Sequence, residues 1–175
     1  MKKIFVMLLM AACTTVVGAQ VKFAHFNSAD ILQNMTEFKT AQEEMQKLSA
    51  QYQEEYTRLM KEYQTKGEEF QKLQQEGKTA QAILQSKAAD LQKMEESIQN
   101  FAQSSQQDLQ QQEAQKMEAL NTKVMAAVKK VAEAGGYVYV LDLSMCQRLN
   151  TPVAFVNSAQ STDISAQLKN ELGVK

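Results

Sequence analysis

Few residues in this chain are of the types that perform acid–base, nucleophilic or metal chemistry. The single histidine, His25, lies in a short stretch rich in strand-forming residues, where a lone histidine is far more often structural than catalytic. Apart from His25, the chain has no histidine that could act as a base and activate a serine or cysteine. There is no phosphate-binding glycine loop and no Cys/His cluster of metal-ligand spacing. The sequence therefore predicts no enzyme, no cofactor and no metal site.

The first twenty residues predict export. Lys2-Lys3 precede an apolar run, residues 4–12, that is too short to span a bilayer, and Val17 and Ala19 are small residues at the usual −3 and −1 positions. We predict a signal peptide at residues 1–19 and a periplasmic mature protein that begins at Gln20. The alternative is that these residues form a buried N-terminal helix.

The two cysteines bear on the export route. Met10-Ala11-Ala12-Cys13 loosely resembles a lipoprotein cleavage box, so lipidation at Cys13 is a second alternative. If residues 1–19 are removed, Cys146 is alone and cannot form an intrachain disulfide. Removing Lys2 and Lys3 leaves 17 basic against 20 acidic residues, a net charge of −3. This balance argues against a nucleic-acid partner.

The composition and the apolar spacing predict long helices. The chain has 24 glutamines, one proline and no tryptophan, and it is rich in good helix formers. From Phe38 onward apolar residues recur in steps of three and four, as in one seam of a coiled coil. We predict a helical hairpin over residues 37–134, with its turn near residues 77–79, where Gly77 ends one helix and Thr79 caps the next. Lys66 occupies a seam position between two aromatic residues.

The second helical run has a seam of Leu, Ile, Val and Ala that becomes dilute between Phe101 and Met117. A disordered low-complexity tract is the alternative there, but the flanking periodicity favours continued helix. Because the far half of the hairpin has no other sequence to pack against, it should project into solvent.

The remaining sequence predicts a small β body, residues 20–36 and 135–175. Residues 21–26 and 152–156 read as short strands, and after Gly135-Gly136 the period changes to two over Tyr137–Asp142, a strand with two apolar faces. Asn27 should cap a short helix. Ser161, Thr162 or Asp163 should cap a final helix with Ile164, Leu168 and Leu172 on one side. The predicted fold class is α+β.

This body is too small to be stable alone, so oligomerisation is the simplest way to cover its second apolar face and its open edges. The residues expected to make this contact are Val21, Phe23, Phe26, Val138, Val140, Val153 and Phe155.

Methionine and tyrosine on the arm suggest a second kind of surface. The structural interpretation is that these side chains pack the two helices together, and the functional interpretation is that they form an adaptable surface for varied partners. The candidate contact residues are Met45, Tyr52, Tyr56, Tyr63, Phe70 and Met94.

Three segments carry a resemblance to a known family: VKFAHFNSADILQNMTEFKTAQEEMQKL, VKKVAEAGGYVYVLD and TDISAQLKNEL. The chain resembles the OmpH/Skp family of periplasmic chaperones for outer-membrane proteins, whose Asp-Ile-Thr is matched conservatively by Asp163-Ile164-Ser165. The resemblance implies a homotrimer with a small central barrel of strands. It also implies three helical hairpins that enclose an unfolded outer-membrane protein without ATP.

The charge of the arm departs from the best-known members of that family, which are strongly basic. Residues 37–134 hold 13 Lys/Arg against 16 Asp/Glu, a net of −3, and residues 66–90 are balanced. This argues against direct contact with membrane or lipopolysaccharide and favours many weak apolar contacts. The alternative function is a periplasmic or lipid-anchored coiled-coil spacer that binds one folded partner.

Overall fold

The computed structural model describes residues 21–144 and 156–174 of the chain. Within the described residues, contacts divide the chain into two compact units, one of residues 21–31, 124–144 and 156–174 and the other of residues 32–123. We name the described part of the first unit the body and the second unit the arm. The predicted signal peptide with Cys13, Cys146, Val153, Phe155 and most of the predicted strand 152–156 lie outside the described residues.

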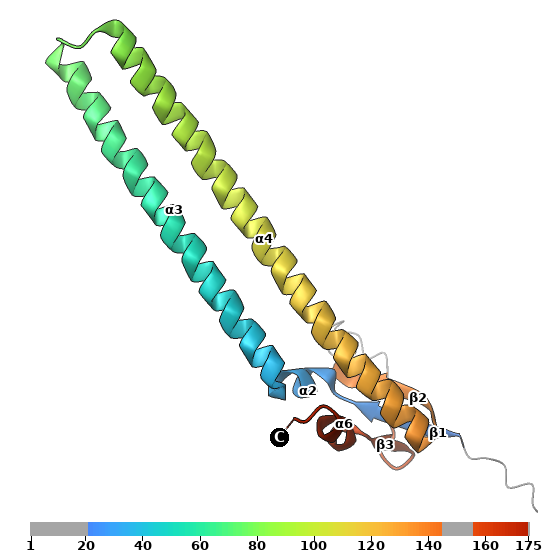
Figure 1. Ribbon diagram of the computed structural model, residues 1–175. Helices are drawn as coiled ribbons and strands as arrows, with labels where there is room; N and C mark the ends of the chain where they lie inside the picture. The colour runs from blue at the N-terminus through green and yellow to red at the C-terminus, as the bar shows by residue number, and fades with distance from the viewer. Residues whose placement is uncertain (1–20, 145–155, 175) are drawn as a thin grey trace, which may run out of the picture. The chain divides into compact units, whose positions relative to one another are not determined.

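The body contains a three-stranded parallel sheet. Its strands are β1 (Lys22–Phe26), β2 (Tyr137–Asp142) and β3 (Ser161–Asp163), in the order β2-β1-β3 (Figure 1). The register sets Phe23 beside Tyr139 on one side and beside Ser161 on the other. Because β1 is central, β2 and β3 are the two edges.

The prediction for residues 161–163 was wrong. They were expected to cap the last helix, but they form β3, and the Ile164 N–H extends the pairing by donating to the His25 carbonyl at 3.0 Å. The helix α6 (Ser165–Glu171) starts after Ile164. The Asp163 carboxylate still accepts a hydrogen bond from the Ser165 N–H at 2.9 Å, as a capping side chain would, although Asp163 itself is the last residue of β3.

The core of the body comes from both ends of the chain. The helix α2 (Ser28–Asn34) begins after Asn27, whose side-chain oxygen accepts the Asp30 N–H at 3.2 Å as an N-cap. Ile164, which directly precedes α6, and Leu168 within α6 are fully buried. The other buried apolar residues of the body are Ala24, Phe26, Ile31, Val124, Ala127 and Val128.

The arm is an antiparallel pair of helices (Figure 1). The first, α3, spans Thr36–Glu76, and the second, α4, spans Gln81–Gly135, with its last turns in the body. Gly77 ends α3 in the left-handed conformation at φ 65°, as a glycine C-cap does. The carbonyl of Ala80 accepts the first bonds of α4, so Ala80 and not Thr79 holds the capping position.

The transition from α4 to β2 explains the paired glycines. Gly136 has φ 65°, a conformation that side chains other than glycine rarely adopt. Gly135 lies so close to the Tyr137 ring that an added Cβ would overlap it. The helix can therefore end and the strand begin within two residues. The predicted α+β fold, a long helical hairpin with a small sheet, is confirmed.

Candidate functional site

Three polar contacts fix the register of the arm helices. They are the ion pairs Glu37–Lys123 (3.1 Å) and Glu44–Lys116 (2.5 Å) and the hydrogen bond Tyr52–Asp108 (2.6 Å). In each pair the two residue numbers add to 160, so all three report one antiparallel alignment. Two of the three contacts, at Asp108 and Lys116, lie where the apolar seam of α4 is dilute, so polar contacts help to align the arm there.

Tyr52 faces the partner helix. Its hydroxyl donates to the Asp108 carboxylate, and its ring packs edge-on against Phe101 with centroids 6.0 Å apart. The hydrogen bond to Asp108 raises the pKa of the Tyr52 phenol above its ordinary value. Nothing in the sequence indicates this pairing, since Asp108 is a lone carboxylate among glutamines. Tyr52 therefore packs α3 against α4, as the structural interpretation of the arm tyrosines expects.

An open groove runs along one face of the arm between α3 and α4. Its volume is about 890 Å³, and a hollow of about 270 Å³ continues it past Ser49, Gln53, Gln106 and Leu109, which line both. We call the two together the arm groove. On α3 it extends from Phe38 to Tyr56.

The lining of the arm groove is apolar and amide-rich. Of the 15 residues around its larger part, only Glu113 and Lys116 are charged, and Lys116 is paired with Glu44. Five lining residues are glutamines. The large apolar residues are Phe38, Met45, Leu109, Met117 and Leu120. The dilute tract of α4 produces the groove, because its small and amide side chains do not fill the space opposite α3.

The two faces of the arm differ in the contacts that they carry. A separate hollow of about 580 Å³ is lined by Glu37, Glu44, Lys116 and Lys123, the residues of the two ion pairs, and it shares only Ala41, Lys116 and Leu120 with the larger part of the arm groove. Helical spacing on α3 places Glu37 and Glu44 on the opposite side of Ala41 from Gln42 and Gln46. One face of the arm is therefore held by ion pairs, and the other is open and nearly uncharged.

The six candidate contact residues divide between these features. Met45 lines the larger part of the arm groove, and Tyr52 and Tyr56 line its continuation. Tyr63, Phe70 and Met94 are half-buried along the distal part of the arm. The sequence missed Phe38, Leu109 and Met117 as groove residues, although all three lie on the predicted seams.

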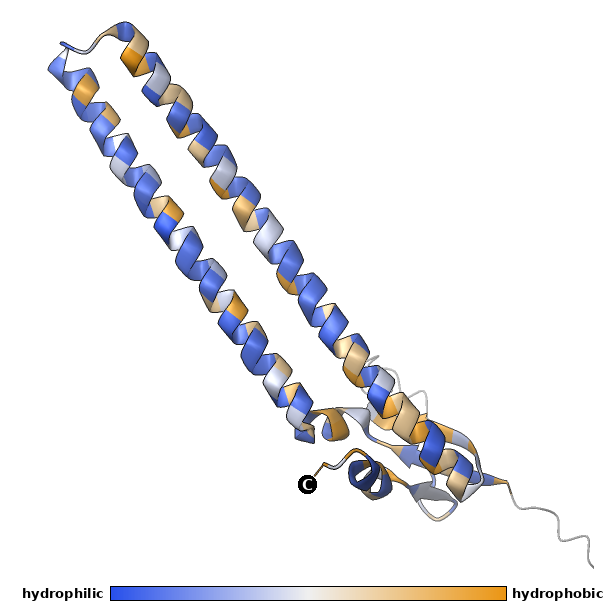
Figure 2. Ribbon diagram, in the orientation of Figure 1, coloured by the Kyte–Doolittle hydropathy of each residue, from blue (hydrophilic) through white to orange (hydrophobic). Residues whose placement is uncertain are grey.

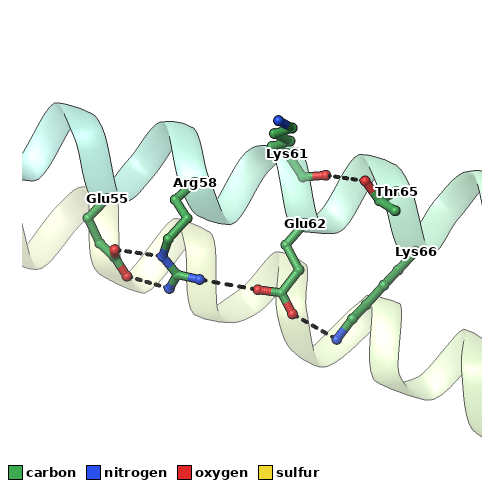
Figure 3. Close-up of polar contacts among 6 residues, drawn as sticks. All are labelled: Glu55, Arg58, Lys61, Glu62, Thr65 and Lys66. Carbon is green, nitrogen blue, oxygen red and sulfur yellow. Dashed lines mark hydrogen bonds and ion pairs between the residues drawn. The ribbon is translucent and has the colours of Figure 1, made fainter.

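One flank of α3 carries a chain of ion pairs (Figure 3). Arg58 holds Glu55 with two hydrogen bonds of 2.6 and 2.8 Å and reaches Glu62 at 3.4 Å, and Lys66 pairs with Glu62 at 3.0 Å. Hydrogen bonds from Arg58 and Lys66 lower the pKa values of Glu55 and Glu62, respectively. Lys66 is therefore an exposed partner of Glu62 and does not fill the seam as predicted. These cations are neutralised by carboxylates and leave no free positive patch here.

The sheet of the body has one exposed apolar face. Phe23 and Tyr139 stack with ring planes 8° apart and centroids 6.1 Å apart, yet they are 42% and 63% exposed. Leu141, two residues after Tyr139 on the same face, is 44% exposed. Parallel sheets are normally covered on both faces. This face is a candidate contact surface for another protein chain.

The predicted oligomerisation residues lie in different environments. Val21, Phe23 and Val138 are exposed, Val140 is half-buried, and Phe26 is only 4% exposed because it packs in the core of the body. Tyr139 and Leu141 were missed, although the period of two placed them on one face. His25 bonds Ser161 at 2.9 Å, which joins β1 to β3 as a structural contact.

Asp142, the last residue of β2, has a carboxylate with several hydrogen bonds. Asp142 accepts bonds from the N–H groups of Ser28 and Ser144 and from the Ser144 hydroxyl at 2.8–3.1 Å. Burial by itself raises the pKa of Asp142, but the bonds from Ser28 and Ser144 outweigh it, so the pKa falls below its ordinary value. Asp142 therefore ties the end of β2 to the start of α2.

Comparison with known proteins identifies the family. The model of the family described as outer membrane protein (OmpH-like) matches residues 22–172, which include both the sheet and the arm. The chain belongs to the OmpH-like family. A search of curated protein sequences found no match.

A solved OmpH-like structure has the same fold. It is the crystal structure of an OmpH-like outer membrane chaperone from Caulobacter crescentus CB15, with 18% sequence identity and a TM-score of 0.70 over 88% of this chain and 85% of that one. At this identity the likeness establishes the fold alone.

Two searches of the described residues found no other type of site. Residues 21–144 and 156–174 contain no group of three or more His, Cys, Asp or Glu side chains placed to hold a metal ion. Within the same residues, no helix of this OmpH-like chain has the length and apolarity needed to cross a membrane.

Proposed function

We propose that this OmpH-like protein is an ATP-independent periplasmic holdase, which keeps unfolded outer-membrane β-barrel proteins from aggregating by holding them between its helical arms. The observation that carries the proposal is the construction of the arm. No residue of α3 is fully buried, and half-buried Met and Tyr side chains are separated by exposed polar and charged ones. Figure 2 shows the arm helices as mostly hydrophilic with single hydrophobic residues between.

Such a surface suits clients that must be held and then released. Each exposed methyl or ring edge gains little by contact with a client, so one contact breaks readily. Several arms acting together raise the effective concentration of such contacts, and retention becomes strong without any single tight site. Release then needs no nucleotide, because the client leaves as it buries its own apolar surface.

Three arms would require a homotrimer, and the exposed sheet face supports assembly through the body. Phe23, Tyr139 and Leu141 form an apolar face on a sheet that is short by the standard of stable domains. Copies of the chain would cover this face and the β2 edge, where Val138 is 59% exposed. The predicted signal peptide supports a periplasmic location for the trimer, between synthesis of the clients and their insertion in the outer membrane.

Aggregation of an unfolded client tests the proposal. A urea-unfolded outer-membrane barrel is diluted into buffer with or without the mature protein, and light scattering is followed. The holdase suppresses scattering of several unrelated unfolded barrels at about one trimer per client and without ATP. A coiled-coil spacer would bind one folded partner and leave scattering unchanged, which would reject the proposal.

A further inference from the structure

The arm groove has the dimensions of a single extended peptide segment. The stretch of α3 along it, from Phe38 to Tyr56, is 18 residue steps, or about 27 Å at a rise of about 1.5 Å per residue. An extended chain advances about 3.3 Å per residue, so the groove accommodates about eight residues. A transmembrane β-strand has about 9–11 residues, so the groove is nearly one such strand long.

The chemistry of the lining also matches one such strand. A transmembrane strand alternates apolar and polar side chains and has few charges on its apolar face. The floor of the groove offers Phe38, Met45 and Met117 to the apolar face. The five glutamine amides along it can donate to and accept from the unpaired backbone of an extended chain.

A second copy of the arm fits the groove less well. One flank of the arm carries the ion-paired chain Glu55–Arg58–Glu62–Lys66. Burying these against an uncharged lining would cost desolvation energy without opposite charges to compensate it.

We infer that the arm groove is a client-binding site, in which one extended, alternating strand segment of an unfolded outer-membrane protein lies between α3 and α4 of a single arm. The inference rests on the proposed function and deepens it, since the retained client is held within each arm as well as between arms. The ion pairs Glu37–Lys123 and Glu44–Lys116 keep the helices together from the flank of α3 that does not line the groove.

Crosslinking tests where the client lies. A photo-crosslinking amino acid replaces Gln46, which lines the groove, or Lys47, its exposed neighbour that lines none of the three hollows. With a urea-unfolded outer-membrane barrel as the probe, position 46 should crosslink to alternating strand segments and position 47 should give several-fold less product. Equal yields at both positions, or crosslinks from position 46 to a second copy of the chain, would overturn the inference.

Filling the groove tests whether it matters. The double variant Ser49→Leu with Gln106→Leu adds bulk to two residues that line both parts of the groove. The matched control, Gln51→Leu with Ser104→Leu, makes the same exchanges at exposed positions outside the three hollows. The filled variant should keep its helical circular dichroism and release the client about tenfold faster, because the two leucines occupy space needed by the client strand and remove two polar side chains that could bond its backbone.

The possible outcomes separate the inference from the proposed function. A filled variant with intact helicity and wild-type client retention would overturn the groove site while leaving the holdase standing. If the filled variant fails to fold, the crosslinking result decides. Failure of the unmodified protein to suppress aggregation would instead reject the proposed function.

Discussion

The body and the arm of this chain are held together by different means. In the body, Ala24, Ile31, Ile164 and Leu168 are fully buried, so a small set of side chains forms a dry core. In the arm, α3 has no buried residue, and the helices are joined by scattered apolar contacts and three polar pairs. Substitutions should therefore act through lost packing in the body and through local opening in the arm.

The largest effect is expected in the core of the body. Leu168→Ala removes a fully buried side chain and leaves a cavity, so the free energy of unfolding should fall by about 2–5 kcal/mol. Chemical denaturation followed by circular dichroism measures the change. The control is Met125→Ala, at a position that is 61% exposed, which should cost far less. Equal losses for the two variants would mean that the body lacks the packed core described above.

A charge on the exposed sheet face should disrupt assembly without unfolding the chain. Tyr139→Asp puts a carboxylate where the proposed trimer buries an aromatic ring, and an unpaired buried charge costs several kcal/mol. Sedimentation velocity should show monomers at concentrations where the wild type is trimeric. Val138→Asp on the β2 edge should behave alike. A variant that sediments as the wild type does would exclude this face from the interface.

The loss of folding stability of the body at low pH should depend on Asp142. Its pKa is lower in the folded state than in the unfolded chain, so ionised Asp142 stabilises the body fully at pH values well above the ordinary carboxyl pKa of about 3.9. This stabilisation is lost as the pH falls through the lower folded pKa. Asp142→Asn should therefore reduce stability at neutral pH and flatten its decline in acid. The measurement is the unfolding midpoint against pH, and parallel curves for both proteins would contradict it.

Hydrogen exchange should separate the arm into two zones. Amides of residues 103–115 should exchange faster than those of residues 118–131, because little apolar surface protects the dilute tract. Tyr52→Phe removes the hydroxyl that bonds Asp108 and should accelerate exchange further in this segment, whereas Tyr56→Phe, with no such bond in the described structure, should not. Uniform strong protection along the arm would show that the groove is closed in solution.

The sequence predicted long elements well because periodicity determines them. Steps of three and four from Phe38 identified the hairpin, Gly77 its turn, and Gly135-Gly136 the change to strand. Residues 161–163 were misassigned because Ser, Thr and Asp are typical helix caps, and only the neighbouring β1 makes them a strand.

The site was predicted less well. Met45, Tyr52 and Tyr56 were correctly placed on the inner seam of α3, but seam periodicity does not distinguish a packed contact from a groove. The difference depends on what lies opposite on α4, and that required the register set by Glu37–Lys123, Glu44–Lys116 and Tyr52–Asp108. Tyr139 and Leu141 could have been found, since alternation alone puts them on one face of their strand; their position beside Phe23 required the register of β1 and β2.

The smallest expected effect tests the central claim, that the arm holds clients by apolar and not by charged contacts. The measurement is the dissociation rate of an unfolded outer-membrane barrel from the mature protein as salt rises from about 50 to about 500 mM, a range over which the screening length falls several-fold. Apolar contact predicts a nearly constant rate, while the groove-filling variant releases the client faster at every salt concentration. A dissociation rate that climbs steeply with salt, and is the same for the filled and unfilled proteins, would contradict the claim and place client binding on the charged faces of the helices.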